Sequence, residues 1–93
     1  MILSTRGKRA TLAVQGRYGK GFPANLVRRT RAMLTALDAA TTVEDLRFPP
    51  GNHLEESRGD RAGQLSVRIN QQWPICFVWT PSGPAEVEIV DYH

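Results

Sequence analysis

A small set of arginines and acid/base side chains could carry chemistry in this 93-residue sequence. All of them lie in its second half: Glu55, Arg58, Arg61, Arg68, Asp91, Tyr92 and His93. Such residues suit one reaction that needs no metal, the attack of an RNA 2′-hydroxyl on the adjacent phosphate. That reaction requires a base near the 2′-oxygen, cations beside the charged phosphorane and an acid for the 5′-oxygen.

Each of these side chains also has an ordinary structural interpretation. The arginines can be plain surface cations, and Glu55 with its neighbour Glu56 can be a solvated strand edge. Asp91 can pair with an arginine or close the sheet, and Tyr92 can be a packing aromatic with its hydroxyl at the surface. The residue types alone leave both interpretations open.

Motifs for metals and nucleotide cofactors are missing from the sequence. His53 and His93 lack spaced ligand partners, and the glycines do not follow a strand in a phosphate-cradling pattern. The lone Cys76 offers neither a disulfide framework nor a cysteine metal site, and we interpret it as a small core residue over a reactive thiol. We therefore expect no metal and no cofactor.

Positive charge is concentrated at the start of the chain. Residues 1–37 contain eight basic residues and no acid, whereas residues 38–93 contain four basic and nine acidic residues. This distribution is typical of a protein that docks on phosphate backbones, because each Lys or Arg there releases condensed counterions. The RNA-binding candidates are Arg28, Arg29, Arg31 and Arg61. The alternative is a solvated helix face on a basic protein.

A hairpin must hold the acid/base set in place. In residues 64–70 apolar and polar side chains alternate, which is the pattern of a half-buried strand. Residues 70–72 are polar enough to turn, and residues 73–79 are apolar on both parities, which indicates a strand buried within a sheet. Trp73 and Trp79 in that strand are interpreted as core residues over RNA-stacking platforms.

The remaining pattern predicts an α+β domain in which two N-terminal helices pack on a mainly antiparallel sheet of four or five strands. Helices are expected in residues 8–18 and from Pro23 to about residue 37, and a single helical turn in residues 43–46. Further strands are expected in residues 1–4, 53–58 and 85–91. We expect one domain over residues 1–93. No apolar run suits a membrane span or signal peptide, so a cytoplasmic location is expected.

The sequence resembles the HigB toxins of bacterial toxin–antitoxin pairs, which belong to the RelE/ParE superfamily. Four stretches carry the likeness: PPGN at 49–52, RGDRAGQLSVRIN at 58–70, QW-ICF at 72–77 and the ending EVEIVDYH at 86–93. Gly21-Phe22-Pro23 before the long helix and Leu37-Asp38-Ala39-Ala40 near its end are similar to that family too. The resemblance covers nearly the whole chain.

The resemblance implies a RelE/ParE-like fold and a ribosome-dependent endoribonuclease that cleaves mRNA in the ribosomal A site. The implied acid/base position falls at Glu55, where some members have His and others Glu. The basic residue before Gly-Asp-Arg falls at Arg58, and Arg68 matches a phosphate-contacting arginine. The last three residues, Asp91, Tyr92 and His93, match the C-terminal group, and the site is expected on the open face of the sheet and its C-terminal edge.

The implied partners are the ribosome with its mRNA and a HigA-like antitoxin with a helix-turn-helix domain. Through that antitoxin the toxin would meet DNA indirectly, and no membrane partner is expected. Two alternatives remain. One is an attenuated toxin that acts mainly as the antitoxin's partner in a DNA-bound repressor complex, and the other is a gyrase poison like the ParE branch.

Two positions depart from the family pattern. Pro74 stands where the family usually has an arginine after the tryptophan, and His53 stands where arginine is common. Losing one donor aimed at the scissile phosphate costs about 3 to 4 kcal/mol of transition-state stabilisation in comparable oxyanion sites. The sequence therefore predicts a weakened nuclease.

Overall fold

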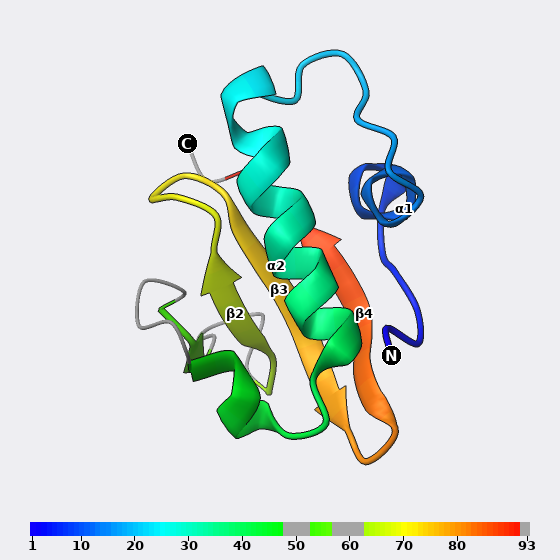
Figure 1. Cartoon of the computed structure of the whole chain (residues 1–93), viewed down its shortest axis with the longest axis vertical. Helices are drawn as coiled ribbons and strands as arrows, with labels where there is room; N and C mark the ends of the chain where they lie inside the picture. Colours follow the sequence, from blue (N-terminus) through cyan, green and yellow to red (C-terminus); the bar gives the residue numbers. More distant parts are fainter. Residues whose placement is uncertain (48–52, 57–62, 92–93) are drawn as a thin grey trace.

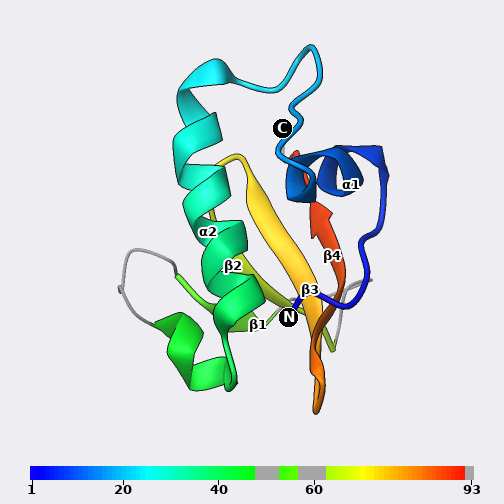
Figure 2. The same ribbon diagram turned by 45° about the vertical axis from the view of Figure 1, so that its right-hand side comes forward.

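The computed structural model describes residues 1–47, 53–56 and 63–91, and it has the α+β architecture that the sequence predicts. The elements are α1 (Lys8–Val14), η1 (Ala24–Leu26), α2 (Val27–Ala39), η2 (Val43–Arg47), β1 (Glu55–Glu56), β2 (Leu65–Arg68), β3 (Pro74–Thr80) and β4 (Gly83–Ile89). The strands pair antiparallel in the order β1-β2-β3-β4. The helix α2 crosses one face of this sheet, and α1 lies beside it near β4 (Figures 1 and 2).

The predicted hairpin is confirmed as β2 and β3. Its turn is stabilised by Asn70, whose side-chain oxygen accepts hydrogen bonds from the backbone N–H groups of Gln72 (2.9 Å) and Trp73 (2.8 Å). This bonding pattern is the one that favours asparagine in turns. Residues 73–77 are buried, as expected for a strand covered on both faces, and Trp73 is a core residue. Residues 78 and 79 are half-buried, so Trp79 packs against the core without being fully inside it, as its place toward the end of β3 allows.

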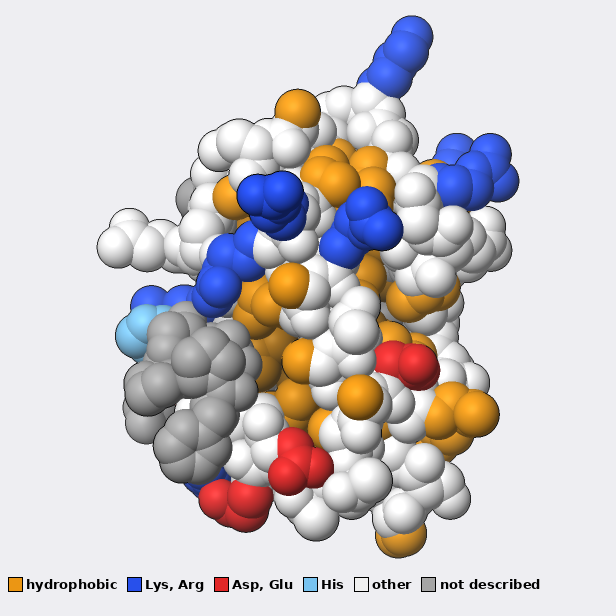
Figure 3. Space-filling model, viewed as in Figure 1, with side chains coloured by type: hydrophobic (Ala, Val, Ile, Leu, Met, Phe, Trp, Pro, Cys, Tyr) orange, Lys and Arg blue, Asp and Glu red, His pale blue; other side chains and the backbone are white. Residues whose placement is uncertain are grey.

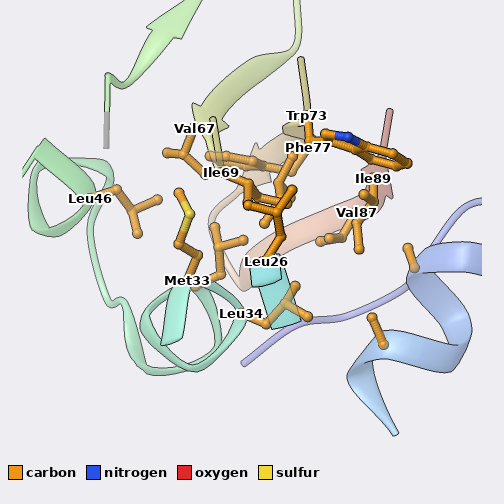
Figure 4. Packing of buried hydrophobic residues seen from close by; sticks show 14 of the residues in the cluster. Leu26, Met33, Leu34, Leu46, Val67, Ile69, Trp73, Phe77, Val87 and Ile89 are labelled. Atoms are coloured by element: carbon orange, nitrogen blue, oxygen red, sulfur yellow. The ribbon is translucent and has the colours of Figure 1, made fainter. Parts of the chain in front are cut away.

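The long helix α2 packs on the sheet through the apolar stripe that the sequence showed. Met33, Leu34 and Leu37 are buried on the side that faces the sheet. Figure 4 shows the first two with Leu26, pointing toward side chains of β2, β3 and β4. Pro23 is the N-cap of η1, so one 3₁₀ turn separates this proline from the first residue of α2.

The first helix is shorter than predicted. It ends at Val14, and Gly16 follows with a φ of 77°, a left-handed conformation that terminates helices. Ala10 and Ala13 are its buried residues, so its packing face is thin. The helix packs on both β4 and α2, in agreement with the prediction that two N-terminal helices pack on the sheet.

The first residues of the chain run alongside β4. The backbone N–H of Leu3 donates to the Pro84 carbonyl (2.8 Å) and that of Arg6 donates to the Val87 carbonyl (2.9 Å). Val87 N–H donates in turn to the Ser4 carbonyl (3.1 Å), and Thr5 forms a parallel bridge with Val87. The edge strand predicted for residues 1–4 is therefore a single parallel bridge at Thr5.

An irregularity in β4 keeps its apolar side chains on the core side. The register with β3 shifts between Cys76 and Val78, and Glu86 adopts a φ of 51°. One extra residue in β4 of this kind is a β-bulge. Val87 and Ile89 are buried against the helices, as the sequence predicted.

Two further predictions can be compared with the described residues. The helical turn expected in residues 43–46 is η2. The strand expected in residues 53–58 is present as β1 over Glu55–Glu56; residues 53 and 54 are not part of the strand, and residues 57 and 58 lie outside the described residues. None of the helices in residues 1–47, 53–56 and 63–91 combines the length and the apolar character that a membrane crossing requires.

We predict that Gly83→Ala destabilises the protein by about 2 kcal/mol, because left-handed backbone strain costs an alanine this much. Gly83 has a φ of 133°, and a Cβ atom there would lie 2.5 Å from the Met1 carbonyl oxygen. The control is Gly19→Ala, whose Cβ would lie 3.9 Å from Leu12 Cδ1, an ordinary contact. Urea unfolding of both variants measures the difference, and equal midpoints would refute the prediction.

Candidate functional site

Two of the predicted site residues lie close together on the sheet. Arg68 Nη2 of β2 is 3.4 Å from Glu55 Oε1 of β1, and the two side chains are 42% and 55% exposed. The register places Glu55 opposite Ser66, so Glu55 and Arg68 are diagonal neighbours on the same face. An ion pair this exposed adds little stability. Both groups are therefore available to a ligand in solvent.

The ends of three strands meet beside this pair. Arg68 lies directly opposite Pro74, the first residue of β3, and the Pro74 carbonyl accepts a hydrogen bond from Val90 N–H (3.0 Å). A proline is tolerated at the first residue of a strand, as the sequence predicted. Asp91 follows Val90, so the chain leads from this junction to the predicted C-terminal group.

Part of the sheet face on which the site was expected is buried. Pro74 and Cys76 share the side of the sheet that carries Arg68, and both are buried. Position 74 is buried, so an arginine there would need its long aliphatic stem to bring the guanidinium to the surface. Of the described residues on this face, the Arg68 and Glu55 side chains offer exposed charge.

Asp91 is held by a partner that the sequence did not indicate. Gln72, from the turn between β2 and β3, donates from Nε2 to Asp91 Oδ1 at 2.8 Å, and both residues are half-buried. The contact joins the β2–β3 turn to the end of β4. Polar residues are expected in any turn, so no sequence pattern distinguishes Gln72 from Gln71.

Arg29 is exposed, as the sequence suggested, but its guanidinium is hydrogen-bonded to the protein itself. From α2 its Nε donates to the Ile69 carbonyl at 2.7 Å, and its Nη2 donates to the Arg68 carbonyl at 3.0 Å. The guanidinium thus spans two consecutive backbone carbonyls at the end of β2. Substitution of Arg29 would remove both of these bonds to the end of β2.

The other two arginines of α2, Arg28 and Arg31, are exposed. Figure 3 shows Lys and Arg side chains gathered on the half of this face where α2 begins and α1 lies, with acidic side chains on the other half. The predicted contact of Arg28 and Arg31 with RNA stays a prediction.

The Arg31 charge also acts on a neighbouring group. Burial raises the pKa of the Tyr18 hydroxyl, and the Arg31 charge opposes that rise.

A row of aromatic rings connects the loop before α2 to the sheet. The ring centroids of Tyr18 and Phe22 are 5.1 Å apart, and those of Phe22 and Trp73 are 5.3 Å apart. The Arg9 guanidinium lies over the Trp73 ring, 4.8 Å from its centroid. The Tyr18 hydroxyl at the other end is buried and has no hydrogen-bond partner in the described part of the chain.

Four predicted site residues, Arg58, Arg61, Tyr92 and His93, lie outside the described residues, so their roles stay predictions. In residues 1–47, 53–56 and 63–91, no three His, Cys, Asp or Glu side chains are grouped so that they could hold a metal ion. The site as described therefore consists of Glu55 and Arg68, with Asp91 at the neighbouring strand end.

Comparison with known proteins places this chain in a family. Residues 14–93 match the model of the HigB-like toxin family, described as the RelE-like toxin of type II toxin–antitoxin system HigB. The chain therefore belongs to the HigB-like toxin family, as the sequence resemblance indicated. Membership of a type II system implies a protein antitoxin as partner.

Individual relatives agree with the family match. The chain is 39% identical over 72 residues to Toxin HigB-1 of Vibrio cholerae, covering 77% of this chain and 75% of that protein. It is 30% identical over 93 residues to Endoribonuclease HigB of Proteus vulgaris, with full coverage of both. The solved YoeB/ParE toxin from Agrobacterium tumefaciens has the same fold, with a TM-score of 0.55 and 19% identity over 99% of this chain and 96% of that one.

We predict that Arg9→Ala lowers the free energy of unfolding by about 1 kcal/mol, because it removes a cation–π contact with a buried tryptophan. The Arg9 Nη1 also donates to the Ile89 carbonyl at 3.5 Å, a long and weak bond. The matched control is Arg28→Ala, an exposed arginine of α2. Chemical denaturation of both variants tests this, and an equal loss in both would contradict it.

Proposed function

We propose that this protein is an endoribonuclease toxin that cuts mRNA on the ribosome and is neutralised by a HigA-like antitoxin. The observation that carries the proposal is the exposed pair of Arg68 and Glu55, a cation and a carboxylate on one face of the sheet, in a chain of the HigB-like family. The full-length likeness to a protein named Endoribonuclease HigB supports the same reaction.

The reaction needs no cofactor in this proposal. A base takes the proton of the RNA 2′-hydroxyl, the 2′-oxygen attacks phosphorus, and the bond from phosphorus to the 5′-oxygen breaks as an acid protonates that oxygen. Arg68 and Arg58 stabilise the negative charge that develops on the phosphorane. Glu55, Asp91, Tyr92 and His93 form the group from which the base and the acid are drawn.

Docking is assigned to a different part of the molecule. Arg28 and Arg31 on α2, together with Arg61, would neutralise phosphates of ribosomal RNA or mRNA. The support for Arg28 and Arg31 is their position in a basic region that holds eight cations and no acid in residues 1–37, whereas Arg61 is included as a sequence candidate alone. Such contacts are sequence-independent and weaken as salt rises. Affinity for the ribosome would then depend on α2 and the rate of cleavage on the sheet.

A second candidate function is supported by Pro74. This residue is buried directly opposite Arg68 and supplies neither a charge nor a donor at the place where the family usually has arginine. A toxin whose nuclease activity is reduced in this way would act chiefly as the antitoxin's partner in a DNA-bound repressor complex. No described feature favours a gyrase poison over these two.

We predict that Arg68→Ala lowers the rate of mRNA cleavage by roughly a hundredfold or more, because one charge-stabilising donor is lost from the transition state. Primer extension on an mRNA in a translation reaction, and on the same mRNA without ribosomes, measures both the rate and the ribosome dependence. The control is Arg47→Ala, which breaks an exposed contact with Glu44 within η2 and removes no residue assigned to the site. Cleavage by Arg68→Ala at the wild-type rate would remove Arg68 from the chemistry.

We predict that Pro74→Arg raises the cleavage rate by up to about a hundredfold, the kinetic equivalent of about 3 kcal/mol. The added guanidinium would join Arg68 across the strand pair and reach the same phosphate. Pro74→Ala is the control, since it removes the proline ring without adding a charge. Antitoxin binding and circular dichroism check the fold of both variants. Equal cleavage by Pro74→Arg and Pro74→Ala would show that position 74 does not contribute.

A further inference from the structure

The backbone carbonyls of Arg68 and Ile69, at the end of β2, receive little support from the neighbouring strands. In β1 the paired residues are Glu55 and Glu56, and the register would place His53 opposite Arg68. His53 instead adopts a left-handed φ of 49° and lies outside the strand. On the other side, Trp73 N–H turns back to the Asn70 side chain. Beyond Ser66 the strand β2 therefore has little support from β1, although it carries the site arginine.

Arg29 supplies that support from the opposite layer of the fold. Its Nε and Nη2 atoms bind the Ile69 and Arg68 carbonyls at 2.7 and 3.0 Å. Two parallel donors from one planar guanidinium fix both the position and the direction of the peptide group between them. The helix that carries Arg29 is itself anchored on the sheet by Met33, Leu34 and Leu37.

Within residues 1–47, 53–56 and 63–91, the side chain of Arg68 has no comparable restraint of its own. Its described contact is the 3.4 Å approach to Glu55, with both side chains substantially exposed. The position that a long, flexible, solvent-exposed side chain can reach is set by the position of its own backbone. An error of about 1 Å in the placement of a reacting group can cost a hundredfold in rate. The anchoring of the Arg68 backbone therefore matters for the chemistry.

We propose that Arg29 is a positioning residue for Arg68, holding the backbone from which the Arg68 guanidinium reaches the scissile phosphate. This inference rests on the proposed function. It separates Arg29 from its neighbours Arg28 and Arg31, with which the sequence grouped it as an RNA-docking cation. The three arginines share a helix, but the contacts of Arg29 are with the protein itself.

Steady-state cleavage of translated mRNA by Arg29→Ala, Arg29→Lys and Arg28→Ala separates positioning from docking. For Arg29→Ala we expect kcat to fall between about tenfold and a hundredfold with little change in KM. Arg29→Lys should recover only part of this loss, since lysine keeps the charge and lacks the fork. Arg28→Ala should raise KM and reduce its salt dependence, with kcat retained.

The assay is run at a temperature at which circular dichroism shows every variant folded, so that a loss of stability alone does not change kcat. Arg47→Ala serves as the variant with unchanged kinetics. If Arg29→Ala raises KM and keeps kcat, or if Arg29→Lys is as active as wild type, Arg29 is a docking cation and the proposal is overturned.

Nuclear magnetic resonance gives a readout that does not depend on cleavage. The carbonyl ¹³C signals of Arg68 and Ile69 and the Arg68 Nε–H signal should shift in Arg29→Ala and stay in place in Arg28→Ala. Unmoved signals would overturn the positioning role even if kcat fell. A wild-type protein that does not cleave mRNA would instead refute the proposed function, and these signals would still decide whether Arg29 holds Arg68.

Discussion

The packing of Trp73 is the interaction on which the other parts of this fold depend. The Trp73 ring carries the Arg9 guanidinium of α1 on its face and packs in a T-shaped arrangement with Phe22 from the loop before α2. Its backbone carbonyl accepts from Ile69 N–H, and its N–H donates to the Asn70 side chain. One buried residue thus joins the first helix, the loop and both strands of the hairpin. The strand ends that carry the candidate site are fixed by the same junction.

Local patterns were enough to predict most of the fold. The alternation in residues 64–70, the polar turn at Asn70 and the apolar stripe of α2 each reflect a periodicity that side chains within one element determine. The bulge at Glu86 was not predicted, because it depends on how β4 must shift to keep Val87 against the helices. The end of α1 was placed too late, since its apolar face gave little indication of where packing stops.

The candidate site was predicted less completely, and Arg29 shows why. Three arginines at positions 28, 29 and 31 look alike in sequence, and helical periodicity places all of them off the apolar stripe. The difference between them arises from a turn forty residues later, where the Arg68 and Ile69 carbonyls meet α2. The contact of Gln72 with Asp91 is of the same kind. Such long-range hydrogen bonds leave no local pattern to read, whereas the family resemblance gave Arg68 and Glu55 as candidates, and the structure brings these two side chains within 3.4 Å of each other.

The pairing of residues 3–6 with β4 has a consequence for the order in which the protein forms. The backbone N–H groups of Leu3 and Arg6 donate hydrogen bonds to the carbonyls of Pro84 and Val87. Residues 3–6 therefore cannot pair until β4 has been synthesised. Synthesis proceeds at about 5 to 20 residues per second, and a contact of this sequence separation closes late. During translation, the first helix can form but has no β4 to pack on. A complete toxin therefore appears only after nearly all of its chain has left the ribosome that makes it.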